Sequence, residues 1–505
     1  MKNIYKTIIL TLVSIFMYTS CDLEENPPFL LTDDIYSSVE GADTALNGIL
    51  SEFASFDYYA ANFQHTTLYM SGMIVPKKPI DIATIGILSP SPSQNYPTNL
   101  WRGMYIAISR ANDLIGNVNE GDDPEMDNIL GLAYFLRAHT YFNLVRIYGG
   151  VPLHTEPTTR ENIHKPRASV EEVYNLIISD AKKAEQLMLD AGQQTGGRPG
   201  KLAANMLLAK VYMTLAGNDN GSEYWQKAYD EAIQVYGQYS LVSNYDDLWS
   251  SISTANNNSE SIFEIQFNKE HSSAMIKLFT PNNAFKGKGW ERFRANPEII
   301  DNHMARYPDD PRINFTFISK YKKSNNKTAK VYPSDPKRKN FKTAYPYIYK
   351  FFIKDNTATT DKSNYNYVLY RYADLLLMLA EIENELGMSV EAHAHVNEVL
   401  KRARESSEGA VEPADWEGLS QDEFREAIMK EYTYELFAEG QDFFNARRRG
   451  YDWFKSHVID VHNARNNKNF DLVYPDNPKG MLLPIPTVEI DTNEKLTAAD
   501  QNPGY

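Results

Sequence analysis

One long helical stretch with a wide apolar surface constrains the fold of this chain most. The segment ILGLAYFLRAHTYFNLVRIYGG, residues 129–150, spaces apolar side chains three and four residues apart, and further apolar residues widen the stripe beyond one face. A helix with so much apolar surface packs between neighbouring helices. Gly149 and Gly150 are expected to end it, because glycine tolerates the backbone angles of a helix end. We therefore expect a layered helical scaffold.

Two further segments indicate that the helices come in pairs. The stretches 207–217 and 377–387 share a Leu-Ala step, a run of helix formers and a closing glycine, and helical stretches at 222–237 and 389–405 follow them. Small residues such as alanine let two helices approach closely. Pairs of this length resemble tetratricopeptide repeats. Periodicity alone leaves a generic antiparallel helix bundle as the alternative.

Capping boxes predict two helix starts. Ser169 with Glu172 opens a helix that should run to about residue 191, and Ser420 with Glu423 opens another. In a capping box the two side chains accept hydrogen bonds from each other's backbone N–H groups. These starts are fixed by local chemistry, without help from the rest of the fold.

Two regions, about 57–100 and 240–365, interrupt the helical pattern. They are rich in Pro, Gly, Asn, Ser and Lys, with aromatic residues between them. The stretch 89–97 (SPSPSQNYP) is expected to be irregular, whereas 261–267 (SIFEIQF) alternates as a short strand does. The fold class is therefore mostly α, with long loop excursions and minor β-structure. Long loops on a rigid scaffold often carry function.

The single cysteine of the chain, Cys21, lies at the end of an N-terminal export signal. Residues 1–20 have a basic start, an uncharged apolar run from residue 8 to residue 17, and small residues directly before the cysteine. This order is typical of a bacterial secretory signal, and the run is shorter than the roughly 20 residues of a membrane-spanning helix. We expect cleavage before Cys21 and lipid on its sulfur, although Tyr18 departs from the usual leucine of a lipoprotein box. A plain signal peptide is the alternative.

Charge and composition exclude several functions. The formal net charge is -15, and it becomes -17 without residues 1–20, which carry two lysines and no acid. A chain this acidic is poorly suited to nonspecific binding of nucleic acid or anionic lipid. One cysteine excludes an internal disulfide and a cysteine-based metal cluster within the chain. No later segment is apolar enough to cross a membrane, so lipid is the expected attachment.

The sequence offers little for catalysis. It holds no nucleophile elbow and no phosphate-binding loop. His393 and His395 are two residues apart and so do not share a helix face. We expect no enzymatic activity, no cofactor and no metal. A surface glycosidase remains an alternative, because sequence cannot show whether two carboxylates meet across a cleft.

A stripe of glutamates is the one candidate for acid/base or metal chemistry. The residues fall four apart on one predicted helix, at Glu431, Glu435 and Glu439. We expect them instead to pair with Arg425 and with the arginines 447–449, or to face water.

The segment RAHTYFNLVRIYGGVPL, residues 137–153, resembles the signature of the SusD/RagB family, the surface lipoproteins of Bacteroidetes nutrient-uptake systems. Four more segments resemble the family in its order, at 100–113, 366–387, 396–404 and 482–505, and the last closes with QNPGY. The resemblance spans nearly the whole chain. One departure is that Asp442 and Asn445 stand where the family pattern has an arginine and an aspartate, the two members of an expected ion pair.

The resemblance implies a domain organisation and a location. Residues 1–20 would be the signal peptide, 21–30 a lipidated acidic tether, and 31–505 a single SusD-like domain with four tetratricopeptide-like units. The acids after Cys21 resemble the tract that directs such lipoproteins to the outer face of the outer membrane. The residues of the family signatures are expected to be scaffold contacts, among them Tyr141, Tyr148, Arg371 and Asp374.

The resemblance also implies that the loops bind a nutrient and that a SusC-like TonB-dependent transporter lies beneath. The family serves both glycans and peptides, and we expect a glycan, because the loops offer aromatic faces with amide and acidic groups. A structural or adhesin role would predict no soluble ligand.

We place the ligand site on the loop-rich regions, with Trp290 at its centre. The segment FKGKGWERFRANP, residues 285–297, carries Trp290 beside a glycine-rich turn, and an indole is a flat platform for the apolar face of a sugar. The alternative is that Trp290 packs back against the scaffold. Other candidates for ligand contacts are Tyr96, Asn95, Asp81, Arg292 and Arg294.

Overall fold

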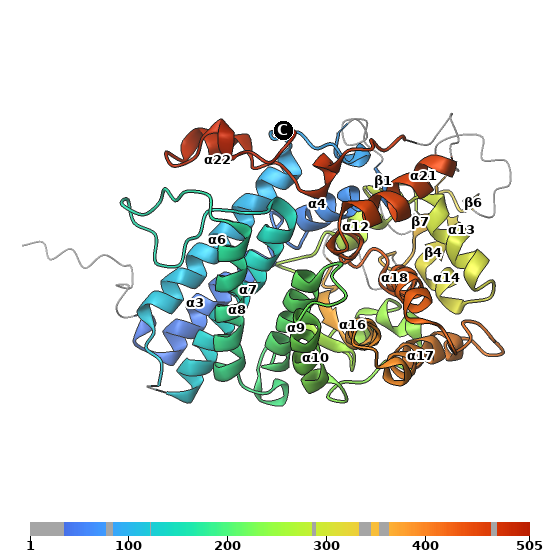
Figure 1. Ribbon diagram of the computed structural model, residues 1–505, viewed down its shortest axis with the longest axis horizontal. Coiled ribbons are helices and arrows are strands. Elements are labelled where there is room, and N and C mark those ends of the chain that lie inside the picture. The colour runs from blue at the N-terminus through green and yellow to red at the C-terminus, as the bar shows by residue number, and fades with distance from the viewer. Residues whose placement is uncertain are drawn as a thin grey trace, which may run out of the picture.

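The computed structural model describes residues 35–76, 84–121, 123–284, 289–332, 345–352, 363–465 and 472–505. The described chain is mostly helical with a few short strands, as predicted (Figure 1). The predicted signal peptide, Cys21 and the tether lie outside the described residues, and so does Asp81.

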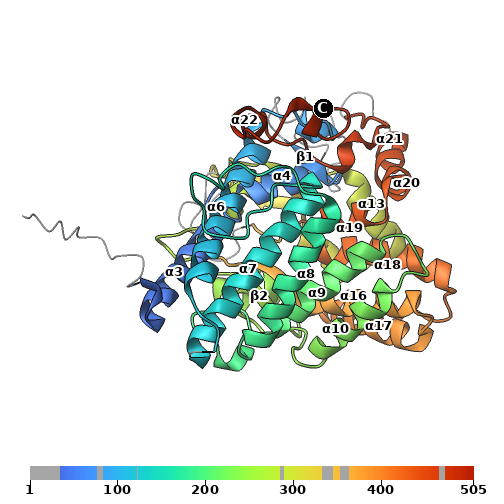
Figure 2. The same cartoon turned by 60° about the vertical axis from the view of Figure 1, so that its left-hand side comes forward.

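Long helices form the scaffold, and each packs on the next to make a continuous array (Figure 2). In order along the array they are α3 (Val39–Phe53), α6 (Asn95–Asn117), α7 (Pro124–Tyr148), α8 (Val170–Leu187), α9 (Leu202–Ala216), α10 (Tyr224–Val235), α16 (Tyr372–Glu385) and α17 (Ser389–Glu405). Helix α18 (Gln421–Leu436) packs on α16. The predicted pairs at 207–237 and 377–405 are α9 with α10 and α16 with α17.

The local signals in the sequence form these helices as expected. In α8 the Ser169 hydroxyl accepts from the backbone N–H of Glu172 and the Glu172 carboxylate accepts from that of Ser169, and α18 starts with the same box at Ser420 and Glu423. Nearly all residues of α7 are buried, and Gly149 caps it with a φ of 77°. Helix α8 ends at Leu187, four residues before the predicted end.

The region 57–100 is more regular than predicted. It contains α4 (Asn62–Met70), in which every residue is buried, and α6 begins within it at Asn95. Asn95 and Tyr96 therefore lie in the first turn of a long helix rather than in a loop, and only 89–94 of the stretch 89–97 is irregular. Pro97 fits there because the first turn of a helix needs no backbone donor at that position.

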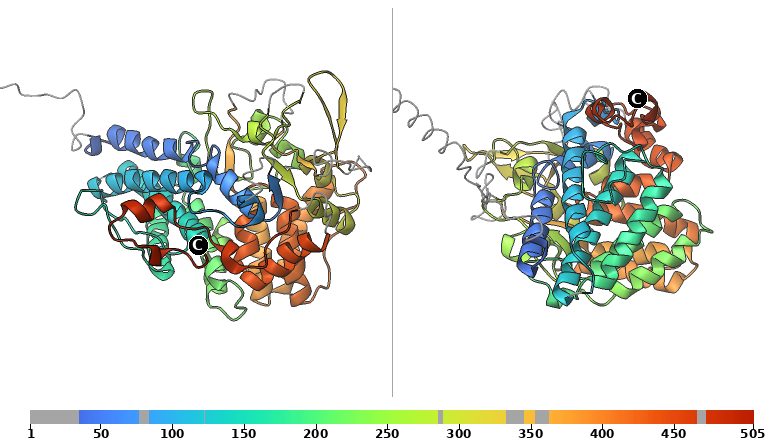
Figure 3. Two further views of the ribbon diagram at one scale, coloured as in Figure 1. Left: turned by 90° about the horizontal axis from the view of Figure 1, so that it is seen from above. Right: turned by 90° about the vertical axis from the view of Figure 1, so that its left-hand side faces the viewer.

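The described part of the region 240–365 consists of short elements that gather on one side of the helical array (Figure 3), and strand β1 from the earlier region joins them. The short helices are α11 (Ile252–Ala255), α12 (Met275–Phe279), α13 (Pro297–Arg306) and α14 (Pro311–Thr316). The strands are β1 (Ile74–Pro76), β2 (Ser261–Ile265), β3 (Phe293–Ala295), β4 (Phe317–Ile318), β5 (Lys320–Lys322), β6 (Thr328–Lys330), β7 (Tyr347–Ile348) and β8 (Tyr367–Arg371). Strand β2 confirms the strand predicted at 261–267.

The strands form one small four-stranded sheet, whose strands come from distant parts of the chain, and two strand pairs. The order in the four-stranded sheet is β1-β3-β7-β4, and β2 pairs with β8 and β5 with β6, all antiparallel. The C-terminal part adds α19 (Asp442–Arg448), α20 (Tyr451–Phe454), a π-helical turn (Lys455–Ile459), α21 (Asp460–Arg465) and α22 (Thr487–Thr492). The 3₁₀ turns are Ile85–Ile87, Ala191–Gln193, Tyr245–Leu248, Pro478–Met481 and Ala498–Asp500.

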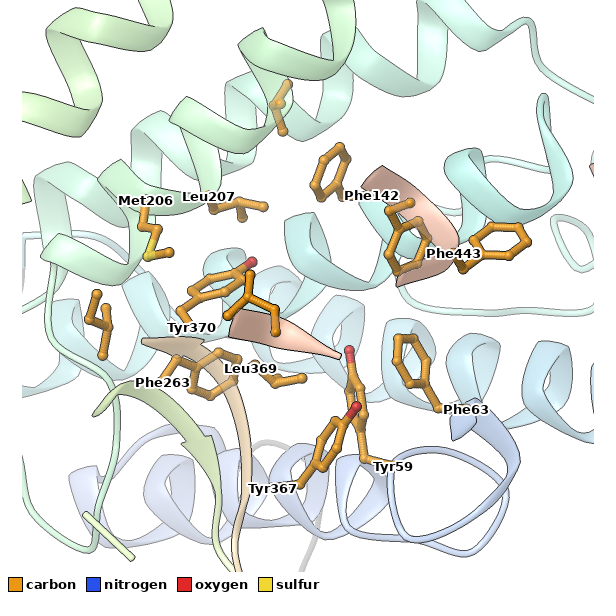
Figure 4. Close-up of a cluster of buried hydrophobic side chains, with 14 of the residues drawn as sticks. Tyr59, Phe63, Phe142, Met206, Leu207, Phe263, Tyr367, Leu369, Tyr370 and Phe443 are labelled. Atoms are coloured by element: carbon orange, nitrogen blue, oxygen red, sulfur yellow. The ribbon is translucent and has the colours of Figure 1, made fainter. Parts of the chain in front are cut away.

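Aromatic side chains join the segment before α4 to α7 and β8 (Figure 4). His139 contacts the hydroxyl of Tyr59 at 2.7 Å through Nε2 and that of Tyr370 at 2.7 Å through Nδ1. The rings of Tyr59 and Tyr367 lie 5.6 Å apart. Because buried polar groups need partners, this network fixes how three distant parts of the chain meet.

The last residues of the chain close onto the end of α7. The side-chain amide of Asn502 donates to the carbonyl oxygens of Tyr148 at 2.9 Å and Leu483 at 2.6 Å, and Asn502 is buried. Arg167 donates to the carbonyl oxygen of Asp500 at 2.6 Å. The closing QNPGY is thus part of the scaffold.

Candidate functional site

The predicted site is built on a segment that lies between α12 and β1. Trp290 and Arg292 donate their backbone N–H groups to the carbonyl oxygens of Lys277 at 2.5 Å and Leu278 at 2.7 Å. Beyond them, β3 pairs with β1, with Arg294 opposite Val75. Backbone hydrogen bonds on both sides hold this segment in place.

Gly289 makes this close packing possible. A Cβ atom at residue 289 would stand 1.7 Å from the carbonyl oxygen of Thr280, which no real side chain can do. Any larger residue would push the segment away from α12. The glycine before Trp290 therefore brings the indole against the protein surface rather than releasing it into a loose turn.

Trp290 is partly buried and forms an aromatic pair with Phe56, whose side chain is 50% exposed. The two ring centroids are 6.2 Å apart, and the planes are inclined by 70°. The Lys277 ammonium nitrogen lies 4.9 Å from the indole centroid, and the Arg292 guanidinium carbon lies 5.7 Å from it. The surface thus combines two aromatic rings with two cations that can donate hydrogen bonds.

Tyr96 also lies against α4. Its ring stacks on His65 at 4.3 Å and lies 6.2 Å from the ring of Tyr69, whose hydroxyl donates to the carbonyl oxygen of Arg292 at 3.3 Å. Asn95 is exposed at the start of α6. The structure therefore brings both predicted segments against one buried helix.

Arg294 does not reach the surface at which we placed it. It is 1% exposed, and its guanidinium pairs with the Glu291 carboxylate and donates to the Tyr347 hydroxyl at 2.6 Å. These contacts hold Arg294 in the interior beside β7, where it does not contribute to the exposed surface.

Phe56 and Lys277 are residues at this surface that sequence reasoning missed. The sequence does show a dense aromatic stretch at 53–63, FASFDYYAANF. Tyr58 and Tyr59 in the same stretch are fully buried, however, and no local pattern separates them from Phe56. Only the packing of residue 290 against this stretch identifies the exposed ring.

The three glutamates are buried and ion-paired, but not with the partners we expected. Only Glu431 and Glu435 lie on α18, because that helix ends at Leu436, before Glu439. Arg312 contacts Glu431 at 2.6 Å and Glu435 at 3.0 Å, whereas Arg371 contacts Glu435 at 2.8 Å and Glu439 at 2.7 Å. Burial alone would raise the pKa of Glu435, but the adjacent arginines lower it to about 2. A carboxylate held ionised in this way is a counterion rather than a proton donor.

The expected partners of the stripe pair elsewhere. Arg425 pairs with Glu385 at 2.7 Å, and Arg448 and Arg449 both pair with Glu381. Within the described ranges no group of three or more His, Cys, Asp or Glu side chains could hold a metal ion. The described part of the chain also contains no helix that is long and apolar enough to span a membrane.

The residues of the family signatures are scaffold contacts, as expected. The Tyr141 hydroxyl donates to the carbonyl oxygen of His154 at 2.9 Å, and the Tyr148 hydroxyl donates to that of Pro97 at 2.7 Å. Asp374 pairs with Lys210 at 2.5 Å in the interior.

Comparison with known proteins shows which family the chain resembles. The model of the SusD family matches residues 259–505, and a second model, described as starch-binding associating with outer membrane, matches residues 33–213. A relative from Formosa agariphila described as SusD-like protein P2 is 27% identical, and the alignment covers 100% of this chain and 99% of the relative.

Solved structures share the fold. A SusD homolog from Bacteroides thetaiotaomicron superposes with a TM-score of 0.77 at 24% identity, over 94% of this chain and 98% of that chain. A structure described as a laminarin binding SusD-like protein superposes with a TM-score of 0.70 at 23% identity, over 92% and 99% of the two chains. The two family matches, the full-length relative and the shared fold lead to one conclusion: the chain belongs to the SusD family.

Proposed function

We propose that this protein is a lipid-anchored protein on the outer face of the outer membrane that binds an extracellular glycan. It passes the glycan to a SusC-like TonB-dependent transporter and catalyses no reaction itself. Membership of the SusD family supports this proposal, as does the family model named for starch binding and the outer membrane. The similar laminarin-binding structure favours a glycan over a peptide.

The aromatic pair of Trp290 and Phe56 is the observation that carries the proposal. A sugar presents an apolar face of C–H groups and a rim of hydroxyls, so it needs aromatic area beside hydrogen-bonding groups. Trp290 and the half-exposed Phe56 supply the area, and Lys277 and Arg292 bring donors to the indole. We propose these residues, with Tyr96, Asn95 and Asp81, as the ligand site.

Affinity electrophoresis against a panel of starch, laminarin and other polysaccharides, followed by calorimetry, tests this site. Trp290→Ala and Phe56→Ala should each weaken binding by roughly 1–3 kcal/mol, the usual value of an aromatic stacking contact. The melting temperature should stay nearly constant. Tyr236→Ala is the matched control, because Tyr236 is an exposed aromatic residue at the end of α10.

Two outcomes would contradict the glycan site. If melting falls by several degrees while the affinity of the folded fraction holds, Trp290 is a core residue and the site lies elsewhere. If no glycan binds but a peptide mixture does, the protein belongs to the peptide-binding members of the family.

The transporter is tested by co-purification. Extraction in mild detergent and pull-down through a C-terminal tag should recover a TonB-dependent barrel together with this chain. Recovery of this chain alone, under conditions that keep other outer-membrane complexes intact, would contradict the delivery role while leaving glycan binding untouched.

A further inference from the structure

Six helices of the scaffold surround a partly open cavity that the aromatic pair does not line. Helices α7, α8, α9, α16, α18 and α19 all contribute to its wall, and its volume is about 310 Å³. This volume is at the lower end of the range of small-ligand pockets. Its charged and amide-bearing side chains are Arg146, Lys210, Asp374, Gln441, Asn445, Arg447 and Arg448.

Positive charge exceeds negative charge in this cavity. Lys210 is neutralised by Asp374 at 2.5 Å, and Arg448 by Glu381. Arg146 and Arg447 form an ion pair with none of the described carboxylates. An enclosed cation without a counterion costs several kcal/mol. In a chain of net charge -15, this local excess needs an explanation.

Arg146 is held rigidly with its charge uncompensated. Its guanidinium carbon lies 3.6 Å from the ring centroids of both Phe142 and Phe444. Nε donates to the carbonyl oxygen of Phe142 at 3.0 Å and Nη2 to the side-chain oxygen of Asn143 at 2.8 Å. No described residue accepts a hydrogen bond from Nη1. The two rings therefore fix the plane of a cation that has donor capacity left.

Arg447, on α19, is a second cation in the cavity wall whose charge no described carboxylate compensates. It is 7% exposed, and its guanidinium donates only to backbone carbonyl oxygens, such as that of Gly480 at 3.0 Å. Carbonyl groups satisfy its hydrogen bonds but do not cancel its charge. Burial lowers the pKa of Arg146 to about 10 and that of Arg447 to about 9, so both remain cations at neutral pH.

Asn445, whose side chain is uncharged, lies in the same wall of the cavity. Its side-chain oxygen is 3.5 Å from Nε of Arg448, which leaves the amide nitrogen as a donor. An aspartate at this position would place a carboxylate among the arginines, and the chain has an amide there instead. The cavity thus offers planar N–H donors and net positive charge together, the combination that binds carboxylate, sulfate or phosphate groups.

We propose that this cavity is a second ligand site, which binds an oxyanion group through Arg146 and Asn445 with Arg447 as a supporting charge. A carboxylated or sulfated sugar and a free inorganic anion share this chemistry. The site is independent of the aromatic pair, so it stands whether or not Trp290 binds glycan.

Calorimetry and thermal melting of the full mature chain at constant ionic strength test the proposal. The probes are sodium sulfate and glucuronate, with glucose as the neutral control. Sulfate or glucuronate should bind and raise the melting temperature, and glucose should do neither. Arg146→Gln should weaken anion binding at least about tenfold, a loss typical of a charge-assisted contact. Lys183→Gln, at an exposed cation paired with Glu120, should leave binding unchanged.

Asn445→Asp is the sharpest variant, because it changes charge without changing size. It supplies the missing carboxylate, so it should abolish anion binding and raise the melting temperature of the free protein. Glucuronate binding tighter than sulfate would identify a carboxylated sugar as the source of the oxyanion, and sulfate binding without glucuronate binding would exclude one. The proposal is wrong if neither anion binds the unaltered protein, or if both variants bind anions as the unaltered protein does. Neutral-glycan binding at Trp290 should persist in Asn445→Asp, which separates the two sites.

Discussion

Arg312 and Glu431 form an ion pair of 2.6 Å in which neither side chain has any exposed surface. Arg312 lies in α14, among the short elements after residue 240, whereas Glu431 lies in the scaffold helix α18. The same guanidinium contacts Asp310 at 2.7 Å and Glu435 at 3.0 Å. One buried cation therefore joins the region that carries the candidate site to the helical array.

Replacing Arg312 should destabilise the protein strongly. Arg312→Met leaves Asp310, Glu431 and Glu435 with less compensation in the interior, and breaking a buried pair costs about 3–5 kcal/mol. Urea unfolding measures the loss. Lys183→Met removes an exposed pair with Glu120 and should cost less than about 1 kcal/mol. Equal losses in the two variants would show that burial of the Arg312 network contributes no stability.

Asp442 should make stability depend on pH in the opposite sense to most carboxylates. Burial raises its pKa from 3.8 to about 7, although Lys350 partly offsets this. The folded state therefore binds a proton more tightly than the unfolded state does. This contribution to stability is present at low pH and is lost as pH rises through about 7.

Asp442→Asn tests that linkage. The side-chain oxygen can still accept from the backbone N–H of Ala438, which lies 3.0 Å from the carboxylate. The stability gained should grow from about pH 4 to pH 7 and then level off, up to roughly 4 kcal/mol at about 1.4 kcal/mol per pKa unit. Unfolding curves of both proteins at several pH values measure it. A gain that is the same at pH 4 and pH 8 would contradict the raised pKa.

Gly289→Ala should impair ligand binding at the candidate site by displacing the segment that carries Trp290. The added methyl group would meet the carbonyl oxygen of Thr280, so the segment that carries Trp290 has to move off α12. Glycan affinity should fall together with stability. Gly192→Ala is the control, because a Cβ atom at residue 192 meets nothing within 4 Å. Unchanged glycan binding in Gly289→Ala would show that the position of this segment does not matter for the ligand.

Cys21→Ser should release the protein from the membrane. The prediction rests on the order of residues in the export signal, since Cys21 lies outside the described residues. The variant should remain uncleaved or become soluble in the periplasm. Cell fractionation and surface labelling check this, and persistence at the cell surface would show that lipid on this cysteine is not the anchor.

Local chemistry explains what could be predicted from the sequence. The boxes at Ser169 and Ser420 and the end of α7 at Gly149 depend on neighbours within a few residues, so the sequence predicts them. Helix α4 was missed because all its residues are buried, and a helix buried on every side has no polar face to mark its period.

The candidate site depends on contacts that no local pattern contains. Trp290 and Phe56 meet across more than two hundred residues, and Arg312 reaches Glu431 across 119 residues. The sequence shows that an arginine should pair with a carboxylate, but it does not show which of the many carboxylates that will be. Only the packed fold determines the partner. The same reason made Arg425 and residues 447–449 a plausible but wrong choice for the glutamate stripe.

The hydrogen bonds of Asn502 also determine when, during synthesis of the chain, the end of α7 can reach its final contacts. The carbonyl oxygen of Tyr148, at the end of α7, receives the Asn502 amide only after the ribosome has made residue 502. During synthesis the first third of the protein therefore lacks a buried partner that the finished fold supplies. Under the proposed export, the chain would cross the inner membrane before this contact forms, because the carbonyl group of Tyr148 and the amide of Asn502 lie far apart in the sequence.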